Sequence, residues 1–592
     1  MSATLSELEK KQIAEAEELL FSGEAKEGFC KELFFGHFRE SSIMPWTELS
    51  AGEQEAGDTA VAAVRQFCHE HIDPAAIDRE ARIPDRVIEG LGQLGVLGMT
   101  ISPEFGGAGM SQKNYSRVIE VIGGHCGSTC VFVNAHHSIG VRALALFGTD
   151  EQRQRWLAPL MTGQQIAAFA LTEEQAGSDA GNVRTRAEPT ADGRGYTLNG
   201  EKRWITNGGI ADCLTVMART PDPAVPNGKI TAFLVTPDMD GFEVLEERME
   251  KVGIRGTATG RIRFSDMFVP AENILGPLGG GLKVALTVLD YGRTTFGAGC
   301  TGVARYCVDR MVERANQRIQ FGKTLGEFEL VQQKIAEGAA DTYAMESATW
   351  HTAALIDSGA DDYMIETAML KVFASDQLWR IVNDCLQIWG GKGFFTDEPF
   401  ERMMRDARLN QIGEGANDVL RCFVAAVGLR HLGKEMETIQ RHALKRPWDA
   451  FKLLPKRVQV PVKHEHLTWY ARQLGRQIAH FAWSCQSALI RHRESIINRQ
   501  FVQARLGDIA TELFVSSCVY SRLSALMVNG TIEEPVKARE FRTGTLYLRL
   551  AQRRNAIRFH DLKTNHDDEM AQVARDWLEQ GSGPAAGAGT PG

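Results

Sequence analysis

The sequence predicts a mainly α-helical protein with a central antiparallel β domain and an additional helical domain at its C-terminus. Apolar residues recur at helical spacing over residues 1–165, and short β-branched and aromatic runs follow over residues 166–280. Long amphipathic segments return over residues 281–433. At 592 residues the chain is too long for a single hydrophobic core, so several domains are expected.

The N-terminal region, residues 1–165, has the spacing of packed helices. Val61, Val64 and Phe67 form one apolar stripe of this kind. His136 and His137 suggest a metal site, but successive side chains on a helix diverge by about 100° and cannot meet at one ion. We therefore expect no metal site.

Residues 166–280 read as a small β domain without alternating βαβ units. Strand-like runs occur at residues 214–218, 230–236 and 261–264. Asn199-Gly200 stands between two further runs, and this pair is typical of a two-residue type I′ turn. The sequence therefore predicts a hairpin at Asn199-Gly200.

Four long amphipathic segments in residues 281–433 favour a helical bundle. The run Gly297-Ala-Gly299-Cys-Thr-Gly302 matches the G-x-G-x-x-G pattern of dinucleotide-binding folds. That pattern has meaning after a strand and with an acid roughly 20 residues later, and neither condition is met. We expect the glycines to allow tight packing against a neighbouring helix or a ligand.

The rest of the chain divides into a basic linker (residues 434–464), a helical domain (465–575) and a flexible Gly/Ala/Pro-rich tail (576–592). The linker has six basic residues against the single acid Asp449 between residues 445 and 463. We hypothesise that it holds the protein on an anionic membrane surface; a solvated linker is the alternative. Its apolar contacts would be Trp448, Phe451, Leu453 and Leu454.

Bulk composition narrows the function classes. A net charge of -9 argues against a general nucleic-acid binder. The 11 scattered cysteines fit a reducing cytoplasm. Neither an N-terminal targeting segment nor an 18-residue apolar run is seen. We expect a cytoplasmic protein, at most peripheral to a membrane.

Glu414 is the main candidate for a catalytic residue. It stands between Gly413 and Gly415 at the start of a helix whose apolar residues begin at Val419. Glycines let the backbone pass close to a bound molecule and adopt unusual angles. The alternative is a carboxylate that only complements the helix dipole.

Four other segments, with Gly413-Glu414-Gly415, carry a resemblance to a known family. They are Phe169–Asp179, Trp204–Gly209, Arg318–Lys323 and Gln387–Phe394. Together and in this order they resemble the acyl-CoA dehydrogenase family across about residues 55–433. The C-terminal extension, with the run Ser495–Phe501, is most similar to the very-long-chain branch.

The resemblance implies a helical domain, a middle β domain, a C-terminal four-helix bundle and FAD as cofactor. The implied reaction is α,β-dehydrogenation of a long or very long acyl-CoA to trans-2-enoyl-CoA in fatty acid β-oxidation. Glu414 would be the α-proton base, because partial desolvation raises the pKa of a carboxyl group, and flavin N5 would accept the hydride. The thioester oxygen would bind the Glu414 N–H and a flavin hydroxyl. Electrons would pass to an electron-transfer flavoprotein, and the protein would be a homodimer or tetramer.

The implied site residues fall into three groups. The catalytic group is Glu414 with Arg293, which would hold the loop of Glu414. The substrate group is Ser178, Asp290, Arg293, Gly413 and Gly415. The cofactor group comprises Phe169, Leu171, Thr172, Gly177, Ser178, Trp204 and Thr206 along the flavin, Arg318, Gln320, Phe321, Gln387, Gly390 and Gly391 toward the FAD of a neighbouring subunit, and Ala416 and Asp418 after the base.

Departures from the family pattern affect the site. Some relatives carry the base on an earlier helix, at the position of Gly292, which cannot act as one. Ala416 replaces a usual Thr, and Gly413 replaces an aromatic residue, which should widen the pocket. Glu174 and Glu329 also stand where Pro and Gln are usual.

Two other functions are open at this stage. A flavin oxidase of the same fold would release peroxide under air, and a respiratory-complex assembly protein would have no turnover. The retained Glu414 makes the assembly role unnecessary.

Overall fold

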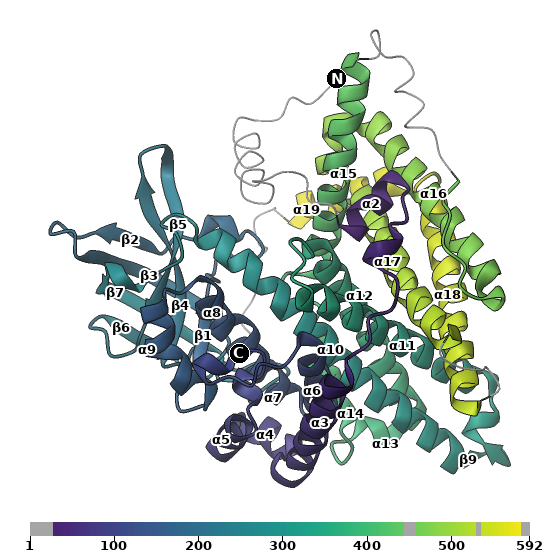
Figure 1. The fold of residues 1–592 in the computed structure, drawn as a ribbon, viewed down its shortest axis with the longest axis horizontal. Helices are drawn as coiled ribbons and strands as arrows, with labels where there is room; N and C mark the ends of the chain where they lie inside the picture. Colours follow the sequence, from purple (N-terminus) through teal and green to yellow (C-terminus); the bar gives the residue numbers. More distant parts are fainter. Residues whose placement is uncertain (1–27, 443–456, 529–533, 582–592) are drawn as a thin grey trace.

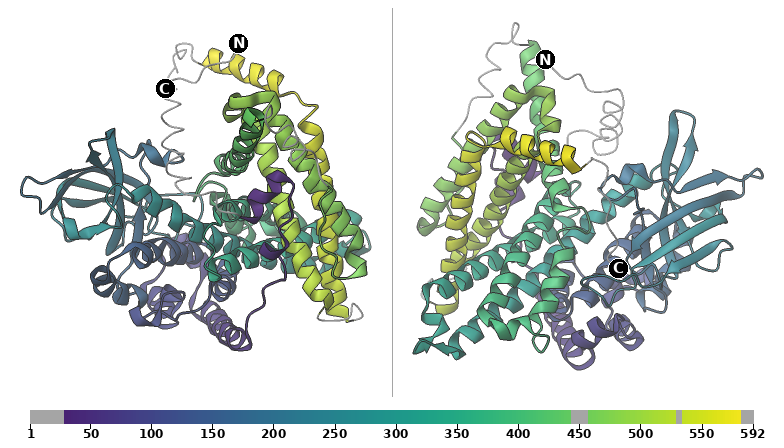
Figure 2. Two further views of the ribbon diagram at one scale, coloured as in Figure 1. Left: turned by 45° about the horizontal axis from the view of Figure 1, so that its top comes forward. Right: turned by 180° about the vertical axis from the view of Figure 1, so that it is seen from behind.

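The structure is a computed structural model that describes residues 28–442, 457–528 and 534–581. The β-sheet lies at one end of the long axis, the C-terminal helices lie at the other, and the remaining helices lie between them (Figure 1). The view from behind gives the same order (Figure 2). The predicted fold class is confirmed: a mainly helical chain with a central sheet and an added C-terminal helical domain.

The N-terminal helices begin at caps that the sequence supplies. Ser50 and Thr149 accept hydrogen bonds from the backbone three residues on and form capping boxes. Asp73 caps a helix that starts with Pro74. The helices are α3 (Ala51–His71), α4 (Pro74–Glu80), α5 (Asp85–Gln93), α6 (Gln112–His125), α7 (Gly127–Val133), α8 (Arg142–Phe147) and α9 (Asp150–Met161).

A π-helical segment, Asn134–Val141, joins α7 to α8 without a break. The combined helix is long and apolar enough to cross a bilayer, but 67% of its apolar window is buried inside the fold, as in a core helix. Its adjacent histidines have separate partners: His136 Nε2 binds Leu160 O, and His137 Nε2 accepts from the Thr100 N–H. Turns of π-helix often occur at functional sites.

The middle region is one eight-stranded sheet, antiparallel except where β4 pairs with β1 and β2. The predicted runs at 214–218, 230–236 and 261–264 fall largely in β4, β5 and β7. The strands are β1 (Ala167–Ala170), β2 (Arg186–Pro189), β3 (Gly195–Ile205), β4 (Cys213–Asp222), β5 (Val225–Val235), β6 (Phe242–Glu246), β7 (Gly260–Pro270) and β8 (Ile274–Leu275).

The predicted hairpin at Asn199-Gly200 is wrong. β3 continues through both residues, and its pairing with β7 shifts register there. The Asn199 side chain donates to Asp266 Oδ1 at 3.0 Å and accepts from the Asp266 N–H at 2.8 Å. Gly200 has φ +154°, and a Cβ there would lie 2.5 Å from Thr185 Oγ1. The pair therefore forms a β-bulge against a neighbouring strand, where a side chain would not fit.

The four helices predicted for residues 281–433 are α10 (Gly281–Gln317), α11 (Glu329–Asp357), α12 (Met364–Trp389) and α15 (Asn417–His442). Two shorter helices, α13 (Gly391–Phe394) and α14 (Phe400–Leu409), lie between the last two. A Cβ at Gly302 of α10 would lie 1.9 Å from Glu120 O of α6, and one at Gly297 would lie 2.8 Å from Leu370 of α12. The glycine-rich run is thus a helix-packing site, as predicted.

The C-terminal helices are α16 (Thr468–His492), α17 (Gln500–Val528), α18 (Pro535–Asp561) and α19 (Asp567–Gly581). Residues 576–581, expected in the flexible tail, are helical because α19 runs to Gly581. α17 packs against α11, α15 and α18. The first described helix, α2 (Phe29–Phe35), packs against α15, α16 and α17 and shares their hydrophobic core. It therefore lies away from the helices that follow it in sequence.

Part of the predicted linker, residues 434–464, lies outside the described residues, and residues 434–442 are helical because α15 runs to His442. The part outside is residues 443–456, with the predicted membrane contacts Trp448, Phe451, Leu453 and Leu454. At the end of the linker, Lys463 Nζ lies 2.7 Å from Glu40 Oε1.

Candidate active site

Glu414 stands on the loop between α14 and α15, in an unusual backbone conformation. Its φ is +56°, and that of Gly415 is +96°. A left-handed φ is uncommon for a residue with a side chain and persists where surrounding contacts hold it. At position 413 a Cβ would meet Leu409 at 3.7 Å, an ordinary contact distance. The backbone therefore requires glycine at 415 and not at 413.

Two cations hold this loop from neighbouring helices. Arg293 Nε of α10 donates to Glu414 O at 3.4 Å, while its Nη1 binds Asp290 Oδ1 at 3.1 Å. Lys371 Nζ of α12 donates to Gly415 O at 2.7 Å and to Asn417 Oδ1 at 2.8 Å. The loop is thus tied to two rigid elements. The contact expected for Arg293 is present, and its catalytic role stays a prediction.

The two oxygens of the Glu414 carboxylate have different surroundings. Oε1 accepts a hydrogen bond from Asn134 Nδ2 at 2.7 Å. Oε2 is buried and has no hydrogen-bond partner among the described residues. A Cβ at Gly292 would lie 2.6 Å from Oε2. The position at which some relatives carry their base is therefore directly beside the Glu414 carboxylate.

Burial raises the pKa of Glu414 to about 7, against the opposing effects of Arg293, Lys371 and the Asn134 hydrogen bond. The neighbouring carboxyl of Asp290 also has its pKa raised, to about 6, by burial. A carboxylate with a pKa near neutrality is ionised in part at pH 7 and is a stronger base than an exposed one. Glu414 therefore has the properties of a general base.

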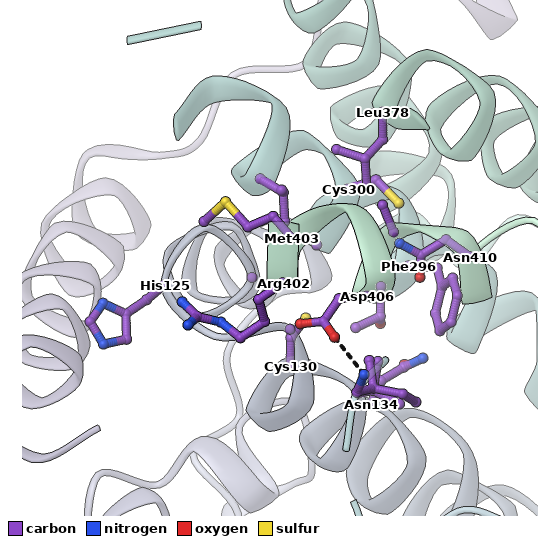
Figure 3. Close-up of a pocket in the computed structure, with 18 residues that line it drawn as sticks. His125, Cys130, Asn134, Phe296, Cys300, Leu378, Arg402, Met403, Asp406 and Asn410 are labelled. Atoms are coloured by element: carbon purple, nitrogen blue, oxygen red, sulfur yellow. Dashed lines mark hydrogen bonds between the residues drawn. The ribbon is translucent and has the colours of Figure 1, made fainter. Parts of the chain in front are cut away.

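A cavity lies beside Asn134, the residue that donates to Glu414 Oε1 (Figure 3). Asn134, which binds Glu414, forms part of its wall together with Thr295. The apolar wall comes from α7, α10, α12 and α14, through Cys130, Phe296, Cys300, Val303, Leu378 and Met403. Such a wall suits a hydrocarbon chain next to a buried base.

Residues of the middle region come together beside β1 and the end of β3. The Arg203 N–H donates to Thr172 O at 3.0 Å, and Lys202 Nζ donates to Leu171 O at 3.0 Å. Trp204 has φ +59° and is 49% exposed, although it lies in a strand. Phe169, Leu171, Thr172, Trp204 and Thr206 therefore belong to one region, with Gly177 and Ser178 exposed on the loop between the strands.

A second concave surface lies at the far end of the molecule. Arg318, Gln320, Gly390 and Gly391 line it together with Arg314, Trp389 and Lys392. Phe321 beside it is 94% exposed with φ +52°, and Gln387 is exposed three residues before Gly390. Its strand β9 (Ile319–Gln320) lies at the lower right of Figure 1, and β1 lies in the left half, with helices between them.

The two residues expected next to the base on the cofactor side lie at the start of α15. Ala416 O accepts from the Leu420 N–H at 2.9 Å, and the exposed Asp418 lies 3.5 Å from Arg421. Within the described chain neither residue hydrogen-bonds to the Glu414 carboxylate.

Comparison with domain families matches four regions in order. They are "Acyl-CoA dehydrogenase, N-terminal domain" (residues 54–164), "middle domain" (168–267) and "C-terminal domain" (279–429), followed by "ACAD9/ACADV, C-terminal domain" (465–582). The chain is 36% identical over 522 residues to the very long-chain specific acyl-CoA dehydrogenase, mitochondrial, of Homo sapiens, over 85% of this chain and 79% of that one. The chain belongs to the acyl-CoA dehydrogenase family.

Further similarities extend over most of the chain. It is 34% identical over 609 residues to the probable acyl-CoA dehydrogenase FadE10 of Mycobacterium tuberculosis, covering 97% and 93% of the two chains. A crystal structure of acyl-CoA dehydrogenase complexed with FAD from Bacillus anthracis superposes with a TM-score of 0.78 at 27% identity, over 89% and 91%. The protein is an acyl-CoA dehydrogenase, and its cofactor is FAD.

The concave surface at the far end fits the anionic part of FAD. Arg314, Arg318 and Lys392 supply positive charge, and Arg314 Nε is buried without a partner in the described chain. An ideal Cβ at Gly390 or Gly391 would meet no atom within 4 Å, so this rim is open to a ligand. The half-exposed Trp204 of the middle domain offers an aromatic face for a flat ring. The residues present therefore fit the cofactor.

Sequence reasoning missed several residues of these sites. Lys371 interrupts the apolar run Leu370–Phe373 of α12, and Asn134 interrupts the apolar helix 127–147. A polar residue in a buried apolar run usually has a partner, so both could have been singled out. Arg314, Trp389 and Lys392 flank predicted residues, but helix geometry alone does not show that they face the same surface.

Proposed function

We propose that Glu414 is the base that removes the α-proton of a fatty acyl-CoA whose acyl chain enters the cavity beside it. One observation carries this proposal: a buried carboxylate with one free oxygen, on a loop held by two cations, accepts a hydrogen bond from Asn134, which lines a largely apolar cavity. Bound FAD supplies the acceptor for the β-hydride. The proton goes to Glu414, and the electron pair of the broken Cα–H bond becomes part of the Cα=Cβ bond.

The backbone of Glu414 can assist the same step. In the described part of the chain its N–H has no hydrogen-bond acceptor. This donor is available to a thioester oxygen, where it would stabilise the negative charge that develops as the α-proton leaves. Arg293 and Lys371 hold the two loop carbonyls that follow it, Glu414 O and Gly415 O. The loop contacts therefore position both the carboxylate and the N–H.

We infer a preference for long or very long acyl chains. The C-terminal helical domain matches a domain named after ACAD9 and ACADV, and curated relatives are named for very long chains. The absence of a side chain at Gly413 also leaves room beside the base. A series of straight-chain acyl-CoA substrates from about 8 to about 20 carbons, assayed with a dye acceptor, tests this preference; a maximum at the short end would contradict it.

We also infer a homodimer, or a tetramer built as a dimer of dimers, with FAD bound between subunits. The strands that carry the two groups of predicted cofactor residues, β1 and β9, are separated by intervening helices (Figure 1), which supports a cofactor shared with a second copy. An electron-transfer flavoprotein is the proposed electron acceptor. Sedimentation with FAD quantification tests the dimer, and a monomer that retains one tightly bound FAD would contradict it. The cytoplasmic location stays a prediction.

Turnover of palmitoyl-CoA with a dye acceptor tests the base. Glu414→Gln keeps the size and the Asn134 contact but cannot accept a proton, so activity should fall by on the order of 10²-fold or more. An equally fast Gln variant would contradict the mechanism. Stoichiometric peroxide under air would favour the oxidase alternative, and no turnover of any acyl-CoA would favour an assembly role.

A further inference from the structure

Asn134 joins the buried core of the N-terminal domain to the catalytic loop. It is the first residue of the π segment, is 2% exposed, and donates through Nδ2 to Glu414 Oε1 at 2.7 Å. An ionised carboxylate can only accept, so the amide nitrogen must face Glu414, and the orientation of the Asn134 side chain is fixed. In the described part of the chain no other side chain donates a hydrogen bond to this carboxylate.

The remaining oxygen is left without a donor. Glu414 Oε2 is buried beside Gly292, where α10 has no side chain that could bind it. A hydrogen bond stabilises negative charge on the oxygen that accepts it and occupies one of its lone pairs. The bare oxygen is therefore the better proton acceptor of the two.

We propose that Asn134 is a positioning residue that holds Glu414 by Oε1 and so assigns Oε2 as the oxygen that receives the α-proton. The inference rests on the proposed role of Glu414 as the base. In this step the Cα–H bond breaks, the proton forms an O–H bond with Oε2, and the electron pair stays with the substrate. The N–H protons of Asn134 are not transferred.

Other charged and titratable groups surround the same carboxylate. Arg293 on α10 and Lys371 on α12 favour its ionised form, and Asp290 is bound to Arg293. The thiols of Cys130 and Cys300 and the phenol of Tyr115 also lie within the electrostatic range of Glu414. None of these groups donates a hydrogen bond to either oxygen of the carboxylate. The effect of losing the Asn134 amide on the titration of Glu414 can therefore be separated from theirs.

Exchange of α-protons isolates the step. The holoenzyme is mixed in D₂O with 3-thiapalmitoyl-CoA, in which sulfur replaces the β-carbon and no hydride can leave, and exchange is followed by NMR between about pH 5 and 9. Asn134→Leu has nearly the same size and no donor. We expect its midpoint to move upward by about one pH unit, with exchange at pH 6 about tenfold slower. Asn134→Asp should move it further, because a second carboxylate then faces Glu414.

Ser138→Ala is the matched control. Ser138 lies in the same π segment, and its hydroxyl contacts Tyr115 at 3.2 Å and Thr295 at 2.8 Å but not Glu414. Its midpoint should equal that of the wild type, which would show that altered packing alone does not shift the titration. Unshifted midpoints in both Asn134 variants would overturn the proposal. If Glu414→Gln still exchanges α-protons at the wild-type rate, Glu414 is not the base, and the assignment on which this proposal rests is overturned.

Discussion

Gly292 of α10 lies against the carboxylate of Glu414, so that a Cβ at position 292 would be 2.6 Å from Oε2. The two residues are far apart in sequence, and the loop before α15 brings them together. One point in space can therefore be reached by a carboxylate from either element. Because Gly292 has no side chain, the Glu414 carboxylate can occupy the space next to it.

A methyl group at this position should displace the base. We expect Gly292→Ala to lower kcat/KM for palmitoyl-CoA by at least about tenfold, because the carboxylate must shift by several tenths of an ångström or more and proton transfer is sensitive to such displacement. Steady-state kinetics with a dye acceptor measures the effect. Gly433→Ala is a control in an open position, since its Cβ would meet its nearest atom only at 3.9 Å.

Moving the base from the loop to the helix is a stronger test. Glu414→Gly removes the base at a left-handed φ that glycine adopts without strain. Adding Gly292→Glu to that variant should restore kcat by at least about tenfold over Glu414→Gly alone, because a carboxylate again occupies the same space. If the double variant is no faster than the single one, the two positions are not equivalent in the active enzyme.

The raised pKa of Glu414 makes both activity and stability depend on pH. Activity needs the ionised base, so kcat/KM should rise with a midpoint near the pKa of about 7. The free energy of unfolding depends on pH in the opposite direction. The pKa of this carboxyl group is near 4.5 in the unfolded chain and about 7 in the folded protein. The folded state therefore loses stability as the pH rises from about 4.5 to about 7.

Glu414→Gln removes the ionisable group that destabilises the folded state at high pH. It should therefore be more stable than the wild type at pH 8, by on the order of 1–3 kcal/mol, and about equally stable below pH 4.5. Thermal unfolding of both proteins at the two pH values measures the difference. A Gln variant that is less stable at pH 8 would show that the carboxylate is stabilised in the folded enzyme.

Lys371 should be a main support of the catalytic loop. Burial lowers the pKa of its ammonium group to about 8, but the group still donates to Gly415 O and Asn417 Oδ1. Lys371→Met leaves both acceptors without this donor and should cost about 2 kcal/mol of unfolding free energy. Urea unfolding measures the loss. Lys463→Met, which breaks the exposed pair with Glu40, should cost less than about 1 kcal/mol.

Local sequence predicted those parts of the fold whose signals are local. The periodic apolar runs gave the long helices α10, α11, α12 and α15, and the β-branched runs gave β4, β5 and β7. Asn199-Gly200 failed because a hairpin and a bulge both use an Asn-Gly pair, and only the partner strand with Asp266 distinguishes them. Likewise, nothing in the residues of α2 specifies which hydrophobic core it joins.

The candidate site was predictable where the backbone constrains the residue type. The glycines beside Glu414 mark a loop with unusual angles, and Gly415 does have a left-handed φ. The Asn134–Glu414 hydrogen bond was not predictable, because it joins residues of two domains whose relative placement depends on the whole packing. The same limit applies to Lys371 and to the surface around Arg314.

Gly413 offers a test of acyl selectivity that separates the side chain from the backbone. Position 413 tolerates a Cβ, so Gly413→Phe should fold normally and fill the space beside the base. We expect it to lower kcat/KM for a 2-methyl-branched acyl-CoA by about tenfold more than for the straight-chain substrate, because the branch lies next to the reacting carbon. Gly415→Ala is the contrast, since its φ of +96° and a Cβ 3.1 Å from Leu420 strain the loop itself. Gly415→Ala should lower kcat/KM for both substrates by the same factor. If Gly413→Phe also lowers kcat/KM equally for both substrates, residue 413 does not face the acyl chain.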